Sequence, residues 1–287
     1  MNNDLPEQKY QAVLFENVKV RRIWHDEQWF YSVVDVVGIL TDSEYQAARK
    51  YWKVTKIRMI DGGYDESVTK CYQLKLPSAD GKKYLTDCAN TEGLLRIIQS
   101  IPSKKAEPIK LWLAQVGRER LEEIANPELS MHRMQEEYKK RGYDEHWIDV
   151  RIRGIVARKE LTDQWKDRGA SEDKEYSILT NNIAKETFDI NVKTHKSLKN
   201  LKEKDNLRDH MTPMELILTM LGEETAKEIH KSRDSQGFRE LSKDTKEAGK
   251  IAKNTRLDIE KKTGKPIVEP ASYQKILQQE KEQKKLK

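Results

Sequence analysis

Residues 32–60 read SVVDVVGILTDSEYQAARKYWKVTKIRMI, and this stretch predicts two helices joined by a tight turn. Ser32 and Asp35 have the spacing of a capping box, and the valines around them recur at helical intervals. Thr41 and Glu44 repeat the signal nine residues later, so we expect a second helix to open there. The sequence therefore predicts a helix-turn-helix in the amino-terminal part of the chain.

The second predicted helix concentrates positive charge. Residues 46–60 contain five cations and no acid, in a chain where 54 Lys and Arg stand beside 48 Asp and Glu. At about 100° per residue, Arg49, Lys53 and Lys56 line one side of an apolar stripe that includes Trp52. Such a helix can enter a DNA groove and place its cations on phosphates or base edges. The alternative is an ordinary amphipathic helix with Trp52 in the core and a solvated charged face.

Segments with strand character lie on both sides of these helices. Residues 18–24 and 29–31 are rich in β-branched and aromatic side chains and predict a hairpin. Residues 71–76 alternate as a half-buried strand does, and a Pro-Ser-Ala-Asp-Gly turn leads back into a partner strand over 82–87. A hairpin after a helix-turn-helix has the outline of a winged helix. The expected fold is α+β, winged-helix-like with β-hairpins plus helices, followed by a mainly α-helical carboxy-terminal region.

The rest of the chain has a helical and strongly charged pattern. Asn126-Pro127 breaks this pattern and sets the first expected domain boundary. The expected divisions are a DNA-binding domain over residues 1–125, a helical connector over 126–170, a helical domain over 171–270 and a charged tail over 271–287.

The charge, the cysteines and the apolar runs of the sequence indicate the kind of partner and the cellular compartment. The net charge of +6 favours polyanionic partners, because each phosphate contact releases a condensed counterion. The two cysteines, Cys71 and Cys88, have no metal-ligand spacing and are expected to be free thiols in a reducing compartment. The first residues lack the pattern of a secretory signal, and no run reaches the roughly 18 apolar residues of a membrane span. We expect a cytoplasmic protein without a membrane partner.

Catalytic motifs are not found in the sequence. The six His are scattered, and there is no H-E-x-x-H, C-x-x-C, G-x-x-x-x-G-K-[ST], G-x-G-x-x-G or G-x-S-x-G pattern. Paired acids such as Glu122-Glu123 fit solvated helix faces better than metal sites. We therefore expect no enzyme, no catalytic residues, no metal ligands and no cofactor. A nucleophilic Cys/His pair would rest on residue type alone.

Two further groups of cations are candidates for contact with nucleic acid. Lys82 and Lys83 lie near the tip of the predicted wing. Lys104 and Lys105 lie at a predicted helix start, where cations oppose the helix dipole unless an anion is near, although a surface turn explains them as well. The nucleic-acid-binding candidates are Arg49, Lys50, Tyr51, Lys53, Lys56, Arg58, Lys82, Lys83, Lys104 and Lys105.

Several separated blocks of the sequence, in order, resemble the Bro-N domain of phage antirepressors and of BRO family proteins. The resemblance covers about residues 15–124, and it implies a DNA-binding module of phage or prophage transcription regulation. No catalytic residues carry over from it. The blocks are Val33–Val37, Leu40–Ser43, Tyr51-Trp52, Asp80–Asp87, Ser100–Pro108 and Trp112–Ala114.

The later part of the chain is similar to the carboxy-terminal region of the DNA-damage-inducible protein D (DinD) family. The residues that carry this looser likeness are Asn206–Met211, Glu215-Leu216 and Gly264–Pro266. It implies a role in the DNA damage response rather than plain antirepression.

Two functions remain open at this level. The first is DNA binding through the basic helix, with neither the strand preference nor the DNA sequence fixed. The second is regulation by protein contact without direct DNA binding, in which the helical half binds a repressor or a recombination or repair protein. The same helices also fit a structural bundle or the seam of a homo-oligomer.

Overall fold

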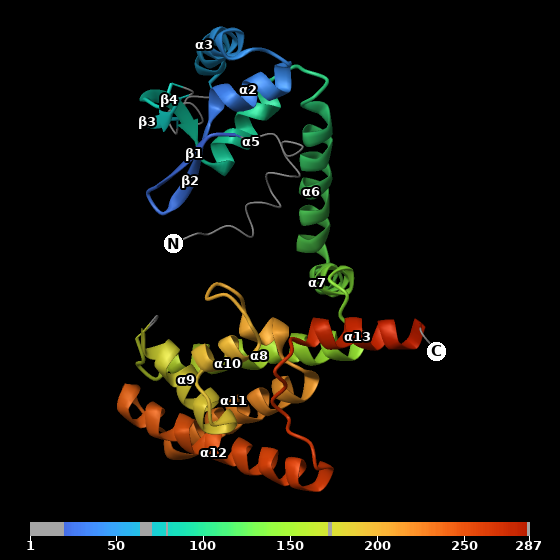
Figure 1. Cartoon of the computed structure of the whole chain (residues 1–287). Helices are drawn as coiled ribbons and strands as arrows, with labels where there is room; N and C mark the ends of the chain where they lie inside the picture. Colours follow the sequence, from blue (N-terminus) through green and yellow to red (C-terminus); the bar gives the residue numbers. More distant parts are fainter. Residues whose placement is uncertain (1–19, 64–70, 79, 172–173, 286–287) are drawn as a thin grey trace. The chain divides into compact units, whose positions relative to one another are not determined.

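The computed structural model describes residues 20–63, 71–78, 80–171 and 174–285. The chain divides into two compact units, Met1–Pro127 and Glu128–Lys287 (Figure 1).

A four-stranded antiparallel sheet forms one part of the amino-terminal unit, with strand order β1-β2-β4-β3. The turn between the first two strands has two residues, Asp26 and Glu27, both at positive φ. This geometry matches the right-handed twist of the flanking strands. The strands are β1 (Arg22–His25), β2 (Gln28–Ser32), β3 (Tyr72–Pro77) and β4 (Lys83–Ala89).

Helices pack beside this sheet around an apolar core. Val36, Val37 and Leu40 of the first helix, and Trp52 and Met59 of the second, are buried in one cluster. The predicted stripe around Trp52 is therefore core. The helices are α2 (Val33–Thr41), α3 (Tyr45–Asp61), α5 (Thr91–Ser100) and α6 (Glu107–Ala125).

The two predicted caps of the helix-turn-helix differ. Ser32 does cap α2, because its hydroxyl accepts a hydrogen bond from the backbone N–H of Asp35. The prediction for α3 was wrong: Thr41 is the last residue of α2, and its hydroxyl donates to the Val37 carbonyl at 2.7 Å. Glu44 is the N-cap of α3 and makes no side-chain capping bond. Asp42, in the left-handed conformation, ends α2 instead.

The regular elements of the carboxy-terminal unit are all helices among its described residues. Residues 126–170, expected to be a connector, supply Trp147, Leu161 and Trp165 to its core. The tail helix also packs inward through Tyr273. The elements are α7 (Glu128–Lys140), α8 (Glu145–Asp167), α9 (Lys174–Phe188), α10 (Val192–Leu198), η1 (Leu207–His210), α11 (Pro213–Arg233), α12 (Gly237–Thr263) and α13 (Tyr273–Lys285).

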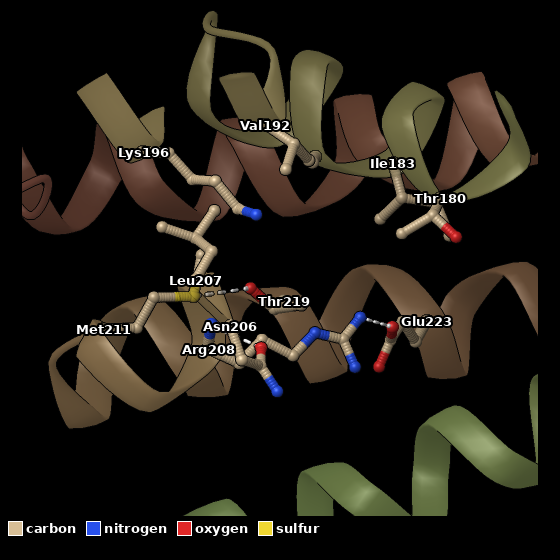
Figure 2. Close-up of a pocket in the computed structure, with 11 residues that line it drawn as sticks. Thr180, Ile183, Val192, Lys196, Asn206, Leu207, Arg208, Met211, Thr219 and Glu223 are labelled. Atoms are coloured by element: carbon tan, nitrogen blue, oxygen red, sulfur yellow. Dashed lines mark hydrogen bonds and ion pairs between the residues drawn. The ribbon is translucent and has the colours of Figure 1, made fainter. Parts of the chain in front are cut away.

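A pocket of about 200 Å³ lies within this unit, between α9, α10, η1 and α11 (Figure 2). Its lining is mostly apolar, and the Arg208 guanidinium pairs with Glu223 at one side of it. The charges that line the pocket at this point are therefore already balanced within the fold.

Helix α12 lies very close to α9. A Cβ atom built on Gly249 would lie 2.6 Å from the Cβ of Glu186 and 2.9 Å from the carbonyl oxygen of Ile183, so only glycine fits there without displacement. Figure 1 shows α12 at the margin of its unit, with α9 and α11 on one side of it.

The expected fold class is confirmed: an antiparallel sheet with helices is followed by a mainly helical region. No helix in the described part of the chain is long and apolar enough to cross a membrane.

Candidate nucleic-acid interface

A groove of about 700 Å³ lies between α3 and the β3–β4 hairpin. Its walls mix positive charge with aromatic rings, a combination suited to a polyanion that also presents flat surfaces. The cationic and aromatic side chains that line it are Arg21, Arg49, Lys53, Lys56, Tyr45, Trp52 and Tyr84.

Asp87 of β4 fixes the rotation of α3. The indole N–H of Trp52 donates to Asp87 at 2.7 Å, and the Lys56 ammonium lies 3.2 Å from the same carboxylate oxygen. Gln73 donates to the other oxygen at 3.3 Å. Burial opposes the ionisation of Asp87, but these three hydrogen bonds outweigh it and lower its pKa. The carboxylate is therefore charged and balances Lys56.

Arg21 closes the other end of the groove. Its guanidinium donates to both carboxylate oxygens of Asp35, at 2.6 and 2.8 Å, and to the carbonyl oxygen of Pro77 at 3.1 Å. The hydrogen bond to Asp35 outweighs the cost of burial and raises the pKa of Arg21. The same guanidinium lies 5.2 Å from the centre of the Tyr45 ring. Arg21 thus ties helix α2 to strand β3 and to the first turn of α3.

The amino-terminal unit has a counterpart among known protein families. Residues 19–119 match the family model described as BRO family, N-terminal domain. This stretch is similar to a Bro-N domain, and the amino-terminal unit is named the Bro-N domain for this likeness. The matched family consists of regulatory DNA-binding domains, which suggest regulation of the antirepressor type, and it is not an enzyme family. No curated protein matches the chain, so the likeness of the later part to DinD stays a prediction.

The groove of the Bro-N domain gathers three of the ten predicted residues. Arg49, Lys53 and Lys56 line it, as their helical spacing predicts. Arg49 and Lys53 are exposed, and neither has an ion pair with a carboxylate among the described residues. Lys50 is exposed on the neighbouring side of α3.

The other α3 candidates lie away from the groove lining. Tyr51 is half-buried and packs against the core, so it is not available as a stacking surface. Arg58 is exposed in the last turn of α3, where a cation is favoured by the helix dipole.

The remaining lysine candidates belong to two separate places on the Bro-N domain. Lys82 and Lys83 are exposed at the β3–β4 turn, and Lys83 shares the sheet face of Asp87 because side chains alternate along a strand. Lys104 and Lys105 lie in the turn before α6 rather than in the helix. The Lys105 ammonium lies 2.7 Å from a carboxylate oxygen of Asp42 in the α2–α3 turn.

The groove lining also includes Arg21, Tyr45 and Tyr84, which the sequence did not single out for contact with nucleic acid. Tyr45 precedes Arg49 by one helical turn, so the spacing that identified the cations could have identified it. Arg21 gives no such signal, because its partner Asp35 is known only from the fold. Tyr84 is 50% exposed and donates to Asp80 at 2.7 Å, which lowers the pKa of that carboxyl group.

The described residues contain neither a cluster suited to a metal nor a reactive thiol. No cluster of three or more His, Cys, Asp or Glu side chains that could hold a metal occurs there. Burial raises the pKa of Cys71 to about 12 and that of Cys88 to about 11, so both thiols stay protonated near neutral pH and are poor nucleophiles.

Proposed function

We propose that this chain is a regulatory protein that binds DNA through the cationic groove of its Bro-N domain. The observation that carries the proposal is the position of Arg49 and Lys53, exposed beside a groove and without a carboxylate partner in the described residues. Unbalanced cations on a firm surface attract phosphates, because binding releases the counterions condensed on the nucleic acid.

The groove is firm because its two walls are bonded to each other. Trp52 is 3% exposed and donates to Asp87, so α3 cannot rotate without breaking a buried hydrogen bond. Lys56 balances Asp87, which leaves Arg49 and Lys53 as the exposed cations of α3 in the groove, with Lys50 exposed beside them. Tyr45 and Tyr84 add aromatic edges that can contact sugars or unpaired bases.

The test is the salt dependence of DNA binding. Changing Arg49, Lys50 and Lys53 to Gln together should reduce the slope of log Kobs against log salt by about 2 to 3 on duplex DNA, since each lost phosphate contact removes about 0.9. The matched control changes Arg58, Lys82 and Lys104 to Gln, an equal loss of charge from exposed positions of the same domain. Equal slopes for the two variants would refute the groove as the DNA-binding surface.

A second candidate function is regulation by protein contact, and helix α6 favours it. Leu111, Leu121 and Ile124 are 68%, 69% and 65% exposed, which is unusual for large apolar side chains on one helix. A repressor, a recombination or repair protein, or a second copy of the chain could cover them. Changing Leu121 and Ile124 to Ser should weaken binding of a purified partner of this kind, or self-association measured by light scattering, and should leave DNA affinity unchanged.

A further inference from the structure

Helix α12 carries several exposed cations on one face. It runs over 27 residues, and Arg239, Lys243, Lys246, Lys250 and Lys261 are all exposed on it. At about 100° per residue these five side chains fall within about 60° of one another around the helix axis. We name these five residues the α12 ridge.

The ridge is not neutralised by the carboxylates of its own helix. None of its five cations has an ion pair in the described part of the chain. Most acids of α12 have other partners: Glu240 accepts from the backbone N–H of Gln236 at 2.9 Å, and Glu247 pairs with Arg233 at 2.8 and 3.0 Å. Asp244 is buried, and Glu260 accepts from the backbone N–H of Ile267. Glu240, Glu247 and Asp258 are the exposed acids among the described residues of the helix, and of these Asp258 has neither a hydrogen bond nor an ion pair there.

The opposite face of α12 holds the ridge in a fixed orientation. Leu241, Ala248 and Ala252 are completely buried there, and Gly249 allows direct contact with α9. Arg256 donates to Asp189 at 2.6 Å and anchors the later part of the helix. The five exposed cations therefore lie on the face of α12 opposite its packed side.

The length and spacing of the ridge fit a linear polyanion. Arg239 and Lys261 are 22 residues apart in the sequence, which corresponds to about 33 Å along the helix axis. That is close to one turn of duplex DNA, about 34 Å. Arg239, Lys243, Lys246 and Lys250 follow one another at three or four residues, so neighbouring side chains lie about 5–6 Å apart at Cβ.

A lipid surface is a poorer match. Helices that lie on membranes bury a broad apolar face next to their cations. The exposed large apolar side chains of α12 are Ile251 and Leu257, and its main apolar face is occupied by α9 and α11.

We propose that the α12 ridge is a second DNA-contacting surface, which binds the phosphate backbone of duplex DNA without reading its sequence. Four of its five cations are Lys, which act as point charges on phosphate, whereas base readout favours the bidentate fork of Arg. The ridge belongs to the carboxy-terminal unit, outside the Bro-N match, so the proposal does not depend on the groove of the Bro-N domain.

The experiment uses the full chain and a non-specific duplex of about four helical turns. Changing Arg239, Lys243, Lys246 and Lys250 to Gln should reduce the salt slope by about 3 to 4 and weaken binding at least tenfold at about 0.1 M salt. The matched control changes Lys140, Lys193, Lys202 and Lys265 to Gln, which removes the same charge from exposed, dispersed positions of the same unit. Gln has nearly the helix propensity of Lys, so both variants should keep the parent's circular dichroism spectrum and melting temperature.

Two further arms distinguish the ridge from the Bro-N groove and from a lipid-binding surface. In the first arm, the ridge changes are added to a chain that already carries the three groove changes. DNA binding should weaken further in this chain, and it should do so even if the groove changes alone have no effect. Vesicles containing phosphatidylserine are tested in parallel. An effect no larger than that of the dispersed control, or a loss of vesicle binding with unchanged DNA binding, would overturn the proposal.

Discussion

The two units are held together by different kinds of interior. The main cluster of the Bro-N domain is apolar, built from Val, Leu, Ile, Trp and Met side chains on α2, α3 and α5. The carboxy-terminal unit also buries charges: Lys199 and Glu215 are at most 1% exposed and lie 3.0 Å apart, and His195 lies 3.0 Å from the same carboxylate. Apolar burial is insensitive to pH, whereas a buried ion pair depends on the charge of both partners. The two units should therefore differ in how their unfolding depends on pH.

The largest expected effect is the loss of one buried partner. Changing Lys199 to Met leaves the buried Glu215 with His195 and the backbone N–H of Thr212 as partners but without its ammonium, which should lower the free energy of unfolding by about 3–5 kcal/mol. Chemical denaturation followed by circular dichroism measures this. The control is Lys202→Met, because Lys202 is exposed and its side chain forms no ion pair among the described residues. Similar stability for both variants would show that the ionic network contributes little.

A smaller effect is expected for the hydrogen bond from Trp52 that helps to position α3. Changing Trp52 to Phe removes the donor to Asp87 but keeps most of the apolar area, so we expect a loss of about 1–3 kcal/mol. If this bond orients the groove cations, DNA affinity should fall as well, although no cation has been changed. Unchanged affinity together with lower stability would assign Trp52 to packing alone.

The pH response should come mainly from the carboxy-terminal unit. The Nε2 atom of His230 lies 3.1 Å from the indole nitrogen of Trp165, which donates to it, so the ring is neutral and its Nδ1 faces Asp244 at 3.0 Å. Burial lowers the pKa of His230. The unfolded chain therefore binds more protons below about pH 6.5, and stability falls as the pH decreases through that range.

Asp244 adds a second loss at lower pH. Burial opposes its ionisation, but hydrogen bonds from Ser235, His230 and Arg233 prevail and lower its pKa. Its contribution to stability is present above the ordinary Asp pKa and is lost as the pH falls through the lower, folded-state value.

Urea midpoints of the parent and of His230→Gln should be compared between about pH 7.5 and 5.5. A slope that is identical in the two proteins would contradict the assignment to His230.

The smallest effect on stability distinguishes the two predicted capping residues, Ser32 and Thr41. Ser32→Ala should cost about 1 kcal/mol because Ser32 caps α2, whereas Thr41→Ala should cost clearly less because Thr41 caps nothing. Thermal melts of the two variants measure the difference. Equal losses would show that the hydroxyl of Thr41 matters through its bond to Val37.

Local patterns predicted the local structure well. The Ser32 cap, the buried Trp52 stripe and the helix-turn-helix followed by a hairpin all follow from residue spacing over a few turns. Contacts between distant residues had no such signal. The bond from Trp52 to Asp87 spans 35 positions and that from Arg21 to Asp35 spans 14, and both depend on how the strands pair. For the same reason residues 126–170, helical by pattern, could not be assigned to a core, because that assignment depends on packing against later helices.

The buried ammonium of Lys199 also donates to the carbonyl oxygens of Glu269 and Ala271, at 2.8 and 3.3 Å. The segment that follows α12 is therefore bonded to the helical bundle, because its backbone carbonyls accept hydrogen bonds from a buried lysine of that bundle. Shortened versions of the protein for crystallisation or expression should keep this segment. A stop codon placed just after Gly264 would leave the Lys199 ammonium with Glu215 as its remaining acceptor and is expected to give insoluble material.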